Sequence, residues 1–276
     1  MKKLMFTLLA GILVCSGCSR LDIAYRWADT YIASKVDDYF DISSEQSKAL
    51  KKDIKKDLLE MKTTLLPVWM ERLDKIQKDV EGGILTDQKV AVYFGAFFKD
   101  IDQINSHFKV TAVDFISSTD AKQIEYFKKS FFKKNQEDLE KAQDTAKLEK
   151  KYREKYEDVF KMFVGSLTDQ QKQFIAENVK ASPYPAELKA KNKAFVFKEF
   201  ISHQDSKEGM KNFVQQYTSQ ADKFDMPEYR TAYQQYQEKL QILISQIMMN
   251  LTERQKLALK ENILQKSEQL RTISSL

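Results

Sequence analysis

The chain has 276 residues and carries 45 basic and 40 acidic side chains, for a formal net charge of +5. So small an excess of positive charge does not favour a nucleic-acid partner. Only two cysteines and two histidines are present, which leaves no thiolate-rich metal site and few groups for histidine chemistry.

A short hydrophobic leader opens the chain. Lys2 and Lys3 precede an apolar run over residues 4–14, which is too short to span a bilayer and has the length of a secretory signal core. The run ends in small residues followed by Cys18, and in this it resembles a bacterial lipobox. The resemblance implies that residues 1–17 are a cleaved signal peptide and that fatty acyl chains on Cys18 (palmitate or similar) anchor the chain in a membrane.

Cys18 suits acylation better than Cys15 does. Cleavage before Cys18 leaves the small residues Ser16 and Gly17 on the leader side, whereas cleavage before Cys15 would leave bulky ones. By resemblance to Gram-negative sorting signals, Ser19 favours the outer membrane of the cell envelope, with the mature chain on its periplasmic face. The alternatives are an ordinary signal peptide with a chance cysteine and an uncleaved anchor. Once Cys18 is acylated, the mature chain has no free thiol.

Residues 18–276 are expected to form a single helical periplasmic domain, which begins with a short tether at residues 18–21. Glycine and proline are scarce in this part, and Lys, Glu, Gln, Leu and Ala are abundant, which favours helices. No stretch alternates between apolar and polar residues for long enough to predict a strand. We therefore predict an all-α fold, an elongated multi-helix bundle of about seven to nine helices.

The individual helices are predicted from apolar spacing and from helix breakers. The first covers residues 22–40, and a second helical stretch covers residues 43–80. Because Pro67 lies inside the second stretch, a kink or break is expected near residues 65–66. The polar segment 133–151 is expected to be a solvated helix face, with a protruding helical arm as the alternative. Further helices are expected at residues 86–115, 120–163, 168–180, 186–203 and 207–224.

The last helical stretch carries the most regular apolar seam, in which steps of four and three residues alternate as in a coiled-coil heptad. We predict that this seam belongs to the core of the bundle, and a site for a partner helix is the alternative. The seam consists of Tyr229, Tyr233, Tyr236, Leu240, Leu243 and Ile247.

A short helix-start motif occurs three times: an apolar residue, then Ser or Thr, then Gln three residues later. This is the pattern of a capping box, in which the hydroxyl accepts from a backbone N–H one turn in and the glutamine reaches back. A looser copy starts at Thr86. Spacings of 82 and 84 residues between Leu85, Leu167 and Leu251 suggest an internal duplication, which the intervening sequence does not establish. The predicted N-caps are Ser43, Thr168 and Thr252, with Gln46, Gln171 and Gln255 as their glutamines.

The motif L-T-x-x-Q also resembles that of the Spy-like periplasmic chaperones, which are small helical proteins that bind unfolded clients on a concave surface. The copies at residues 167–171 and 251–255 match in full, and residues 42–46 match loosely. This chain is much longer than a Spy-like subunit. The resemblance implies an unfolded client as one alternative partner.

Residues 21–73 resemble the opening of an uncharacterised proteobacterial lipoprotein family. That opening has a tyrosine, an Ala-Asp pair and an Asp-Tyr-x-Asp-Leu segment that leads into a helix containing glutamine. Residues 25–29, residues 36–42 and Gln46 correspond to these features, whereas Trp27 and Thr30 depart from them. The resemblance implies a helical lipoprotein domain of unknown function and supplies no catalytic residues.

Three aromatic side chains lie in the first predicted helix, close to the expected anchor. We expect Trp27, Tyr31 and Tyr39 to be core residues of the bundle. The alternative is a candidate docking face for the membrane or for an envelope partner, formed by Tyr25, Trp27 and Tyr31.

No arrangement of side chains in the sequence predicts catalysis or metal binding. His107 and His203 are far apart, no H-E-x-x-H motif occurs, and Glu199 lies four residues before His203, as in a surface pair. Asp100 begins a segment like a calcium loop, but Asn105 stands where that loop requires glycine. We therefore expect no metal site, no cofactor and no catalytic residue.

The sequence favours a non-enzymatic outer-membrane lipoprotein that acts through protein–protein contact. A groove between helices is expected to accept a partner helix or an unfolded segment. The alternatives are a Spy-like holdase and an envelope hydrolase with an unrecognised carboxylate site.

Overall fold

The computed structural model describes residues 20–275 of the chain. Cys18 and the predicted signal peptide therefore lie outside the described residues. Every regular element within residues 20–275 is a helix, and no strand occurs there, which confirms the all-α prediction. The elements are α2 (Arg20–Arg26), α3 (Ala28–Phe40), α4 (Ser44–Thr64), α5 (Leu66–Glu81), α6 (Asp87–His107), α7 (Lys109–Ser118), α8 (Ala121–Gln143), α9 (Thr145–Val164), α10 (Asp169–Ala181), α11 (Ala186–Ser202), α12 (Lys207–Gln220), the 3-10 helix η1 (Ala221–Phe224), α13 (Pro227–Met249) and α14 (Glu253–Ser275).

The prediction of seven to nine helices is wrong, because several predicted helices are divided. The first predicted helix consists of α2 and α3, which meet at Trp27, and the stretch with the expected break consists of α4 and α5, which meet at Leu65. Two further divisions, at Phe108 and at Asp144, were not expected. At Asp144 the side chain accepts a hydrogen bond from the Lys147 backbone N–H at 3.0 Å, which starts a new helix.

At two of the divisions the backbone hydrogen bonds continue across the joint. The Trp27 N–H donates to the Ile23 carbonyl at 3.1 Å, and the Tyr31 N–H donates to the Trp27 carbonyl at 2.9 Å. The Leu65 N–H likewise donates to the Met61 carbonyl at 2.8 Å. These joints are bends, and the spacing of apolar residues runs through them almost unchanged.

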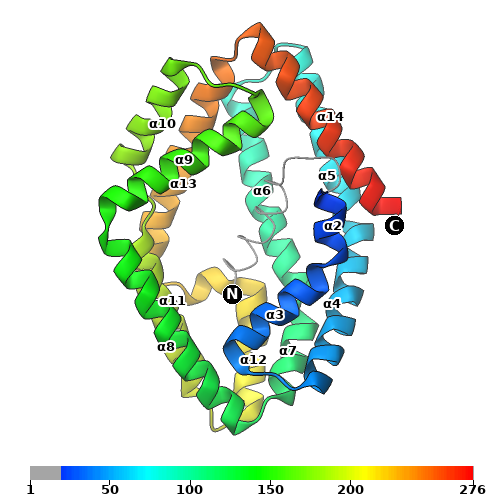
Figure 1. The fold of residues 1–276 in the computed structure, drawn as a ribbon, viewed down its shortest axis with the longest axis vertical. Coiled ribbons are helices and arrows are strands. Elements are labelled where there is room, and N and C mark those ends of the chain that lie inside the picture. The colour runs from blue at the N-terminus through cyan, green and yellow to red at the C-terminus, as the bar shows by residue number, and fades with distance from the viewer. Residues whose placement is uncertain (1–19, 276) are drawn as a thin grey trace.

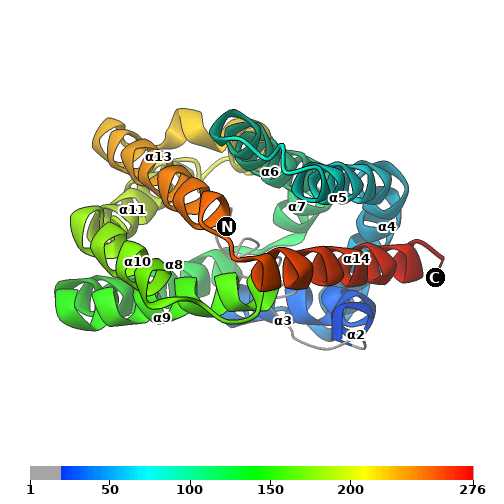
Figure 2. The ribbon, with the colours of Figure 1, turned by 90° about the horizontal axis from the view of Figure 1, so that it is seen from above.

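The helices form an elongated, closed ring (Figure 1). One long side carries α8, α9, α10, α11 and α13, and the other carries α2, α3, α4, α5 and α14. The α9–α10 and α13–α14 connections lie together at one end of the long axis, and the α3–α4 and α7–α8 connections lie at the other. Seen from above (Figure 2), α6 and α13 lie in one layer and α9 and α14 in another.

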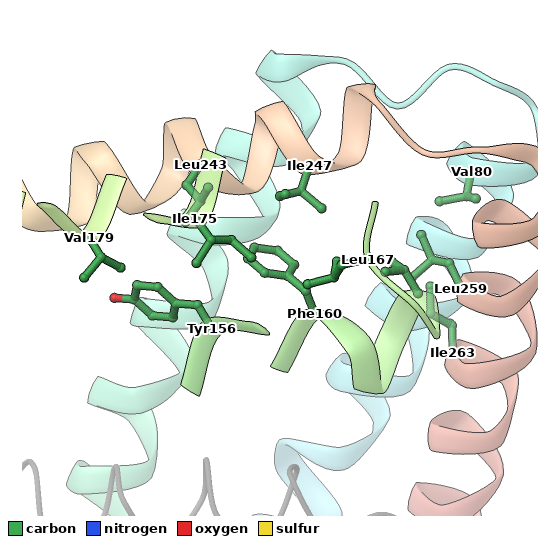
Figure 3. Packing of buried hydrophobic residues seen from close by; sticks show 11 residues of the cluster. Val80, Tyr156, Phe160, Leu167, Ile175, Val179, Leu243, Ile247, Leu259 and Ile263 are labelled. Atoms are coloured by element: carbon green, nitrogen blue, oxygen red, sulfur yellow. The ribbon is translucent and has the colours of Figure 1, made fainter. Parts of the chain in front are cut away.

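Buried apolar side chains gather in several clusters around this ring. The cluster drawn in Figure 3 joins α9, α10, α13 and α14 to Val80 of α5. In it Ile175, Leu243 and Ile247 have no exposed surface, so part of the predicted seam in α13 is core. A second cluster around Phe40 joins α3 to α7, α8, α11 and α12. Burial is thus distributed along the ring, which holds several helix crossings together.

The described chain uses the same helix arrangement twice. The helices α2–α3, α4, α5, α6, α7 and α8 correspond to α9, α10, α11, α12, α13 and α14. Their contacts correspond as well, because α3 packs on α4 and α8 as α9 packs on α10 and α14. A half-turn in the plane of Figure 1 brings one half roughly onto the other.

The two halves interlock through their last helices. α8 and α14 each have 23 residues. α8 packs on α11 of the second half, and α14 packs on α5 of the first. This exchange closes the ring. The equivalent helix starts are Ser43 with Thr168 and Asp120 with Thr252, so the duplication does not follow the spacing of Leu85, Leu167 and Leu251.

Candidate functional site

Four helix starts carry a complete capping box with glutamine three residues after the N-cap. In each, the N-cap oxygen accepts from the glutamine backbone N–H at 2.8 to 3.3 Å. The glutamine Oε1 in turn accepts from the N-cap N–H at 3.0 or 3.1 Å. The boxes are Ser43–Gln46, Asp120–Gln123, Thr168–Gln171 and Thr252–Gln255.

The box at Asp120 lies outside the predicted motif, which has Ser or Thr at the N-cap. Aspartate is as good an N-cap as serine, so the spacing Asp-x-x-Gln was a usable signal. At Thr86, the looser copy, the hydroxyl accepts from the Lys89 backbone N–H at 3.3 Å, and Lys89 stands where the other copies have glutamine.

The four glutamines are joined in two pairs, one at each end of the ring. Gln171 and Gln255 donate to each other's Oε1 at 3.1 and 2.7 Å. Gln46 and Gln123 do the same at 3.0 and 2.7 Å. Each Nε2 also donates to the carbonyl two residues before the partner's N-cap. We call each pair a glutamine clasp.

The clasps are structural. Each ties together two connections that are far apart in the sequence, and each amide oxygen accepts twice while each amide nitrogen donates twice. This uses the hydrogen-bonding capacity of a glutamine side chain fully. The glutamines that suggested a Spy-like chaperone are therefore committed to the fold itself.

The three residues of the candidate docking face do not lie on one side of the helix. The Tyr25 hydroxyl turns inward and donates to the Leu58 carbonyl at 3.1 Å. Trp27 and Tyr31 point outward, with exposed fractions of 64% and 49%, so the prediction that both lie in the core is wrong. Ile23, which is 50% exposed, lies four residues before Trp27. We call Ile23, Trp27 and Tyr31 the apolar stripe.

Tyrosines from three elements pack on the opposite long side of the ring. Tyr184, between α10 and α11, stacks on Tyr152 of α9 with ring centroids 4.9 Å apart. Tyr236 of α13 meets Tyr184 edge-on at 5.1 Å. Beside Tyr152 and Tyr184 lies a cavity of about 210 Å³, which we call the tyrosine cavity. Its apolar walls are Ala142, Leu148, Val179, Pro183, Pro185, Ala186 and Leu188, and its polar ones are Thr145, Glu149 and Glu187.

Lysines lie beside the tyrosine cavity, whose own wall carries the carboxylates of Glu149 and Glu187. The Lys189 Nζ lies 5.3 Å from the centroid of the Tyr184 ring, within reach of a cation–π contact. Burial first, and then repulsion from Lys193 and from two lysines of α9, lower the pKa of Lys189 to about 8, against the attraction of Asp138. Asp138 itself forms an ion pair with Lys193 at 2.5 Å.

The histidines do not come together. The His107 Nδ1 lies 3.7 Å from Glu60, and the His203 Nε2 lies 3.8 Å from Glu199 in the predicted surface pair. Asp100, at the start of the calcium-like segment, instead forms an ion pair with Arg72. Among residues 20–275 no group of three or more His, Cys, Asp or Glu side chains is placed to hold a metal ion.

These features define an all-α protein whose two equivalent halves interlock in a ring. Residues 38–230 match the model of a family described as "Family of unknown function (DUF6279)". The match covers more than half of the chain, so the chain belongs to this family. No curated protein and no solved structure matches it. In the part of the chain that the structure describes, no helix is both long enough and apolar enough to cross a membrane.

Proposed function

We propose that the protein is a bacterial envelope lipoprotein that binds a partner protein and catalyses no reaction. In this proposal residues 1–17 are removed and Cys18 is acylated, so that the helical ring lies on the periplasmic face of the outer membrane. The lipobox-like residues before Cys18 support the anchor, and several acyl chains hold a protein firmly on a bilayer.

The observation that carries the binding role is the tyrosine cavity. At about 210 Å³ it is smaller than the roughly 300 to 1,000 Å³ that is common for small-molecule sites. Its mostly apolar walls suit one buried apolar side chain, which is how many protein interfaces hold their central residue. A small-molecule enzyme site is therefore less well supported than a protein contact.

The charge of the region specifies the partner further. Lys193 and two lysines of α9 lie close enough to Lys189 to lower its pKa. A carboxylate next to the inserted side chain would relieve their mutual repulsion and would be attracted to them on approach. We propose a partner segment in which an apolar or aromatic residue is flanked by aspartate or glutamate.

Photocrosslinking in intact cells tests this proposal. A photoreactive phenylalanine analogue at Leu188, in the cavity wall, is expected to capture one envelope protein through such a segment. The same analogue at Leu257, which is exposed on α14, is the matched control and should not capture it. Purified partner should bind the wild-type chain and lose its affinity for Leu188→Glu. Identical products at both positions, or unchanged binding to Leu188→Glu, contradict the proposal.

Two further measurements separate the alternatives. Equal suppression of aggregation of unrelated unfolded proteins by the wild-type chain and by Leu188→Glu favours a holdase. Labelling with a palmitate analogue should disappear in Cys18→Ser and persist in Cys15→Ser. The reverse pattern contradicts the anchor assignment.

A further inference from the structure

We propose that the apolar stripe lies in the headgroup region of the membrane and forms a second, non-covalent contact with it. This inference rests on the proposed acyl anchor at Cys18. In this inference a lipid surface covers the exposed apolar stripe, and the contact gives the anchored ring a defined orientation.

The stripe is a continuous face of one bent helix. Ile23, Trp27 and Tyr31 follow one another at four-residue steps, which places them on the same side of a helix. The hydrogen bonds from the Trp27 N–H to the Ile23 carbonyl and from the Tyr31 N–H to the Trp27 carbonyl keep this register across the joint of α2 and α3. About half or more of each side chain is exposed.

The second half of the chain provides an internal comparison. The inward positions of α3 include Ile32 and Phe40, and the matching inward positions of α9 are Tyr156 and Val164, in both cases 124 residues later. With the same offset of 124 residues, the positions equivalent to the three residues of the apolar stripe are exposed lysines. These lysines are Lys147, Lys151 and Lys155.

The comparison of α2–α3 with α9 shows whether packing of the ring requires an apolar outer face at these positions. The fold places lysines on the outer face of α9 and still packs its inner face, so an apolar outer face is not needed to build this part of the ring. A tryptophan, a tyrosine and an isoleucine exposed together lower solubility and need another explanation.

The length of the chain between the anchor and the stripe favours the membrane as that explanation. α2 begins at Arg20, two residues after Cys18. With at most about 3.6 Å per extended residue and about 1.5 Å per helical residue, Ile23 lies within roughly 12 Å of Cys18 and Trp27 within roughly 18 Å. Acyl chains in the bilayer therefore hold the start of the stripe near the headgroups.

The chemistry of the stripe fits an uncharged lipid surface. Tryptophan and tyrosine are the residues enriched at membrane–water interfaces, because each combines an apolar ring with a polar tip. The cations beside the stripe are neutralised locally, since Arg26 pairs with Asp22 at 3.0 Å and Lys35 pairs with Asp38 at 2.8 Å. We therefore expect ring burial to dominate, with little dependence on anionic lipid or on salt.

The membrane contact and the tyrosine cavity lie on different helices. α2 lies on one long side of the ring, and the junction of α8 and α9, next to the cavity, lies on the other (Figure 1). Lipid at the apolar stripe and a partner at the tyrosine cavity therefore contact separate parts of the ring.

Tryptophan fluorescence of the full acylated protein tests the inference. The chain has two tryptophans, so Trp69→Phe leaves Trp27 as the only one. After reconstitution in phosphatidylcholine–phosphatidylethanolamine vesicles, Trp27 emission should shift to the blue, be quenched by brominated acyl chains, and lose its quenching by aqueous iodide. Adding 20% phosphatidylglycerol should change these signals little.

Control variants separate the possible outcomes. Leu257→Trp, in a Trp27→Lys, Trp69→Phe chain, reports an exposed position on α14 and should stay accessible to iodide. Trp27→Lys with Tyr31→Lys copies the α9 pattern and should fold normally by circular dichroism. If Trp27 of acylated protein stays open to iodide, or if its blue shift appears without vesicles at concentrations where the chain dimerises, the inference is overturned. Absence of acyl chains on Cys18 by mass spectrometry overturns the proposed anchor instead.

Discussion

Gln171 and Gln255 hold the same end of the ring from opposite sides, each donating to the other's side-chain oxygen, at 3.1 and 2.7 Å. Gln171 also donates to the Asn250 carbonyl at 3.0 Å, and Gln255 to the Ser166 carbonyl at 2.6 Å. Both amides are almost fully buried. The starts of α10 and α14 are thus fixed to each other as well as capped.

We predict that Gln171→Ala destabilises the fold by about 2 to 4 kcal/mol. The substitution removes half of a capping box and takes away one donor and one acceptor that the buried Gln255 amide contacts. Gln46→Ala should cost less, because Gln46 is only partly buried and water can replace its bonds. Urea unfolding followed by circular dichroism measures both values. Equal costs at the two clasps would show that burial is not the deciding factor.

The double variant of the buried clasp gives a sharper result. Once Gln171 is removed, much of the benefit of Gln255 is already lost, so Gln171→Ala with Gln255→Ala should cost clearly less than the sum of the single changes. Simple additivity would mean that the two amides act only as separate caps.

Local geometry could be predicted from the sequence better than long-range pairing. A capping box closes within four residues, so the spacing of Thr168 and Gln171 contains the whole motif. The contact between Gln171 and Gln255 joins residues that are 84 positions apart, and no periodic pattern encodes it. The packing of α8 on α11 and of α14 on α5 could not be predicted for the same reason.

The candidate docking face shows an error that helix geometry could have prevented. Tyr25 and Trp27 are two residues apart, which is about 200° around a helix, so they cannot share a face. Ile23, four residues before Trp27, has the spacing that a face shared with Trp27 and Tyr31 requires. The tyrosine cavity could not be predicted, because it forms where the Tyr184 connection folds back on α9.

We predict that the fold loses stability above about pH 10, in part through the buried tyrosines. Burial raises the pKa of Tyr152, Tyr184 and Tyr236 above the ordinary value of 10.0. In this alkaline range the folded chain keeps phenolic protons that the unfolded chain has lost, so the free energy of unfolding falls as the pH rises. Absorbance at 295 nm should show tyrosines that ionise only on unfolding. Tyr184→Phe should reduce the alkaline loss, whereas Tyr126→Phe, at an exposed site, should not.

We predict that Lys189 makes partner binding sensitive to pH near 8. Burial first, and repulsion from Lys193 and the α9 lysines second, lower the pKa of Lys189 to about 8, while Asp138 acts in the opposite direction. A carboxylate of the partner should therefore be held more weakly as the pH rises from 7 to 9. Lys189→Gln should weaken binding at pH 7 by roughly 10-fold, on the scale of one hydrogen bond to a charged group. Fluorescence anisotropy measures this affinity, with a labelled peptide that has the sequence of the partner segment captured at Leu188.

The stability of the free chain should respond to the same lysine with the opposite sign. Between pH 8 and about 10.5 the unfolded chain holds a proton on Lys189 that the folded chain has released, so this residue makes the fold more stable as the pH rises. Lys172→Gln, at an exposed pair with Asp169, is the control for both measurements. A binding curve that does not change between pH 7 and 9 would remove Lys189 from the contact.

We predict that Asp57→Asn stabilises the fold at pH 7. Asp57 is buried on α4 and accepts a hydrogen bond from the Thr111 hydroxyl at 2.6 Å. Burial raises the pKa of Asp57, and nearby Glu60 raises it further, so the folded chain binds the proton more tightly than the unfolded chain. The free energy of unfolding therefore falls as the pH rises from 3.8 through the raised pKa, and ionised Asp57 lowers the stability of the fold at neutral pH. Asparagine keeps an oxygen for Thr111 and carries no charge.

Urea unfolding at pH 7 and pH 4 should show a stabilisation that shrinks in acid, and Asp158→Asn, at an exposed site on α9, should show no such pH dependence. Destabilisation at pH 7 would mean that the bond from Thr111 to the charged form outweighs the cost of burying it.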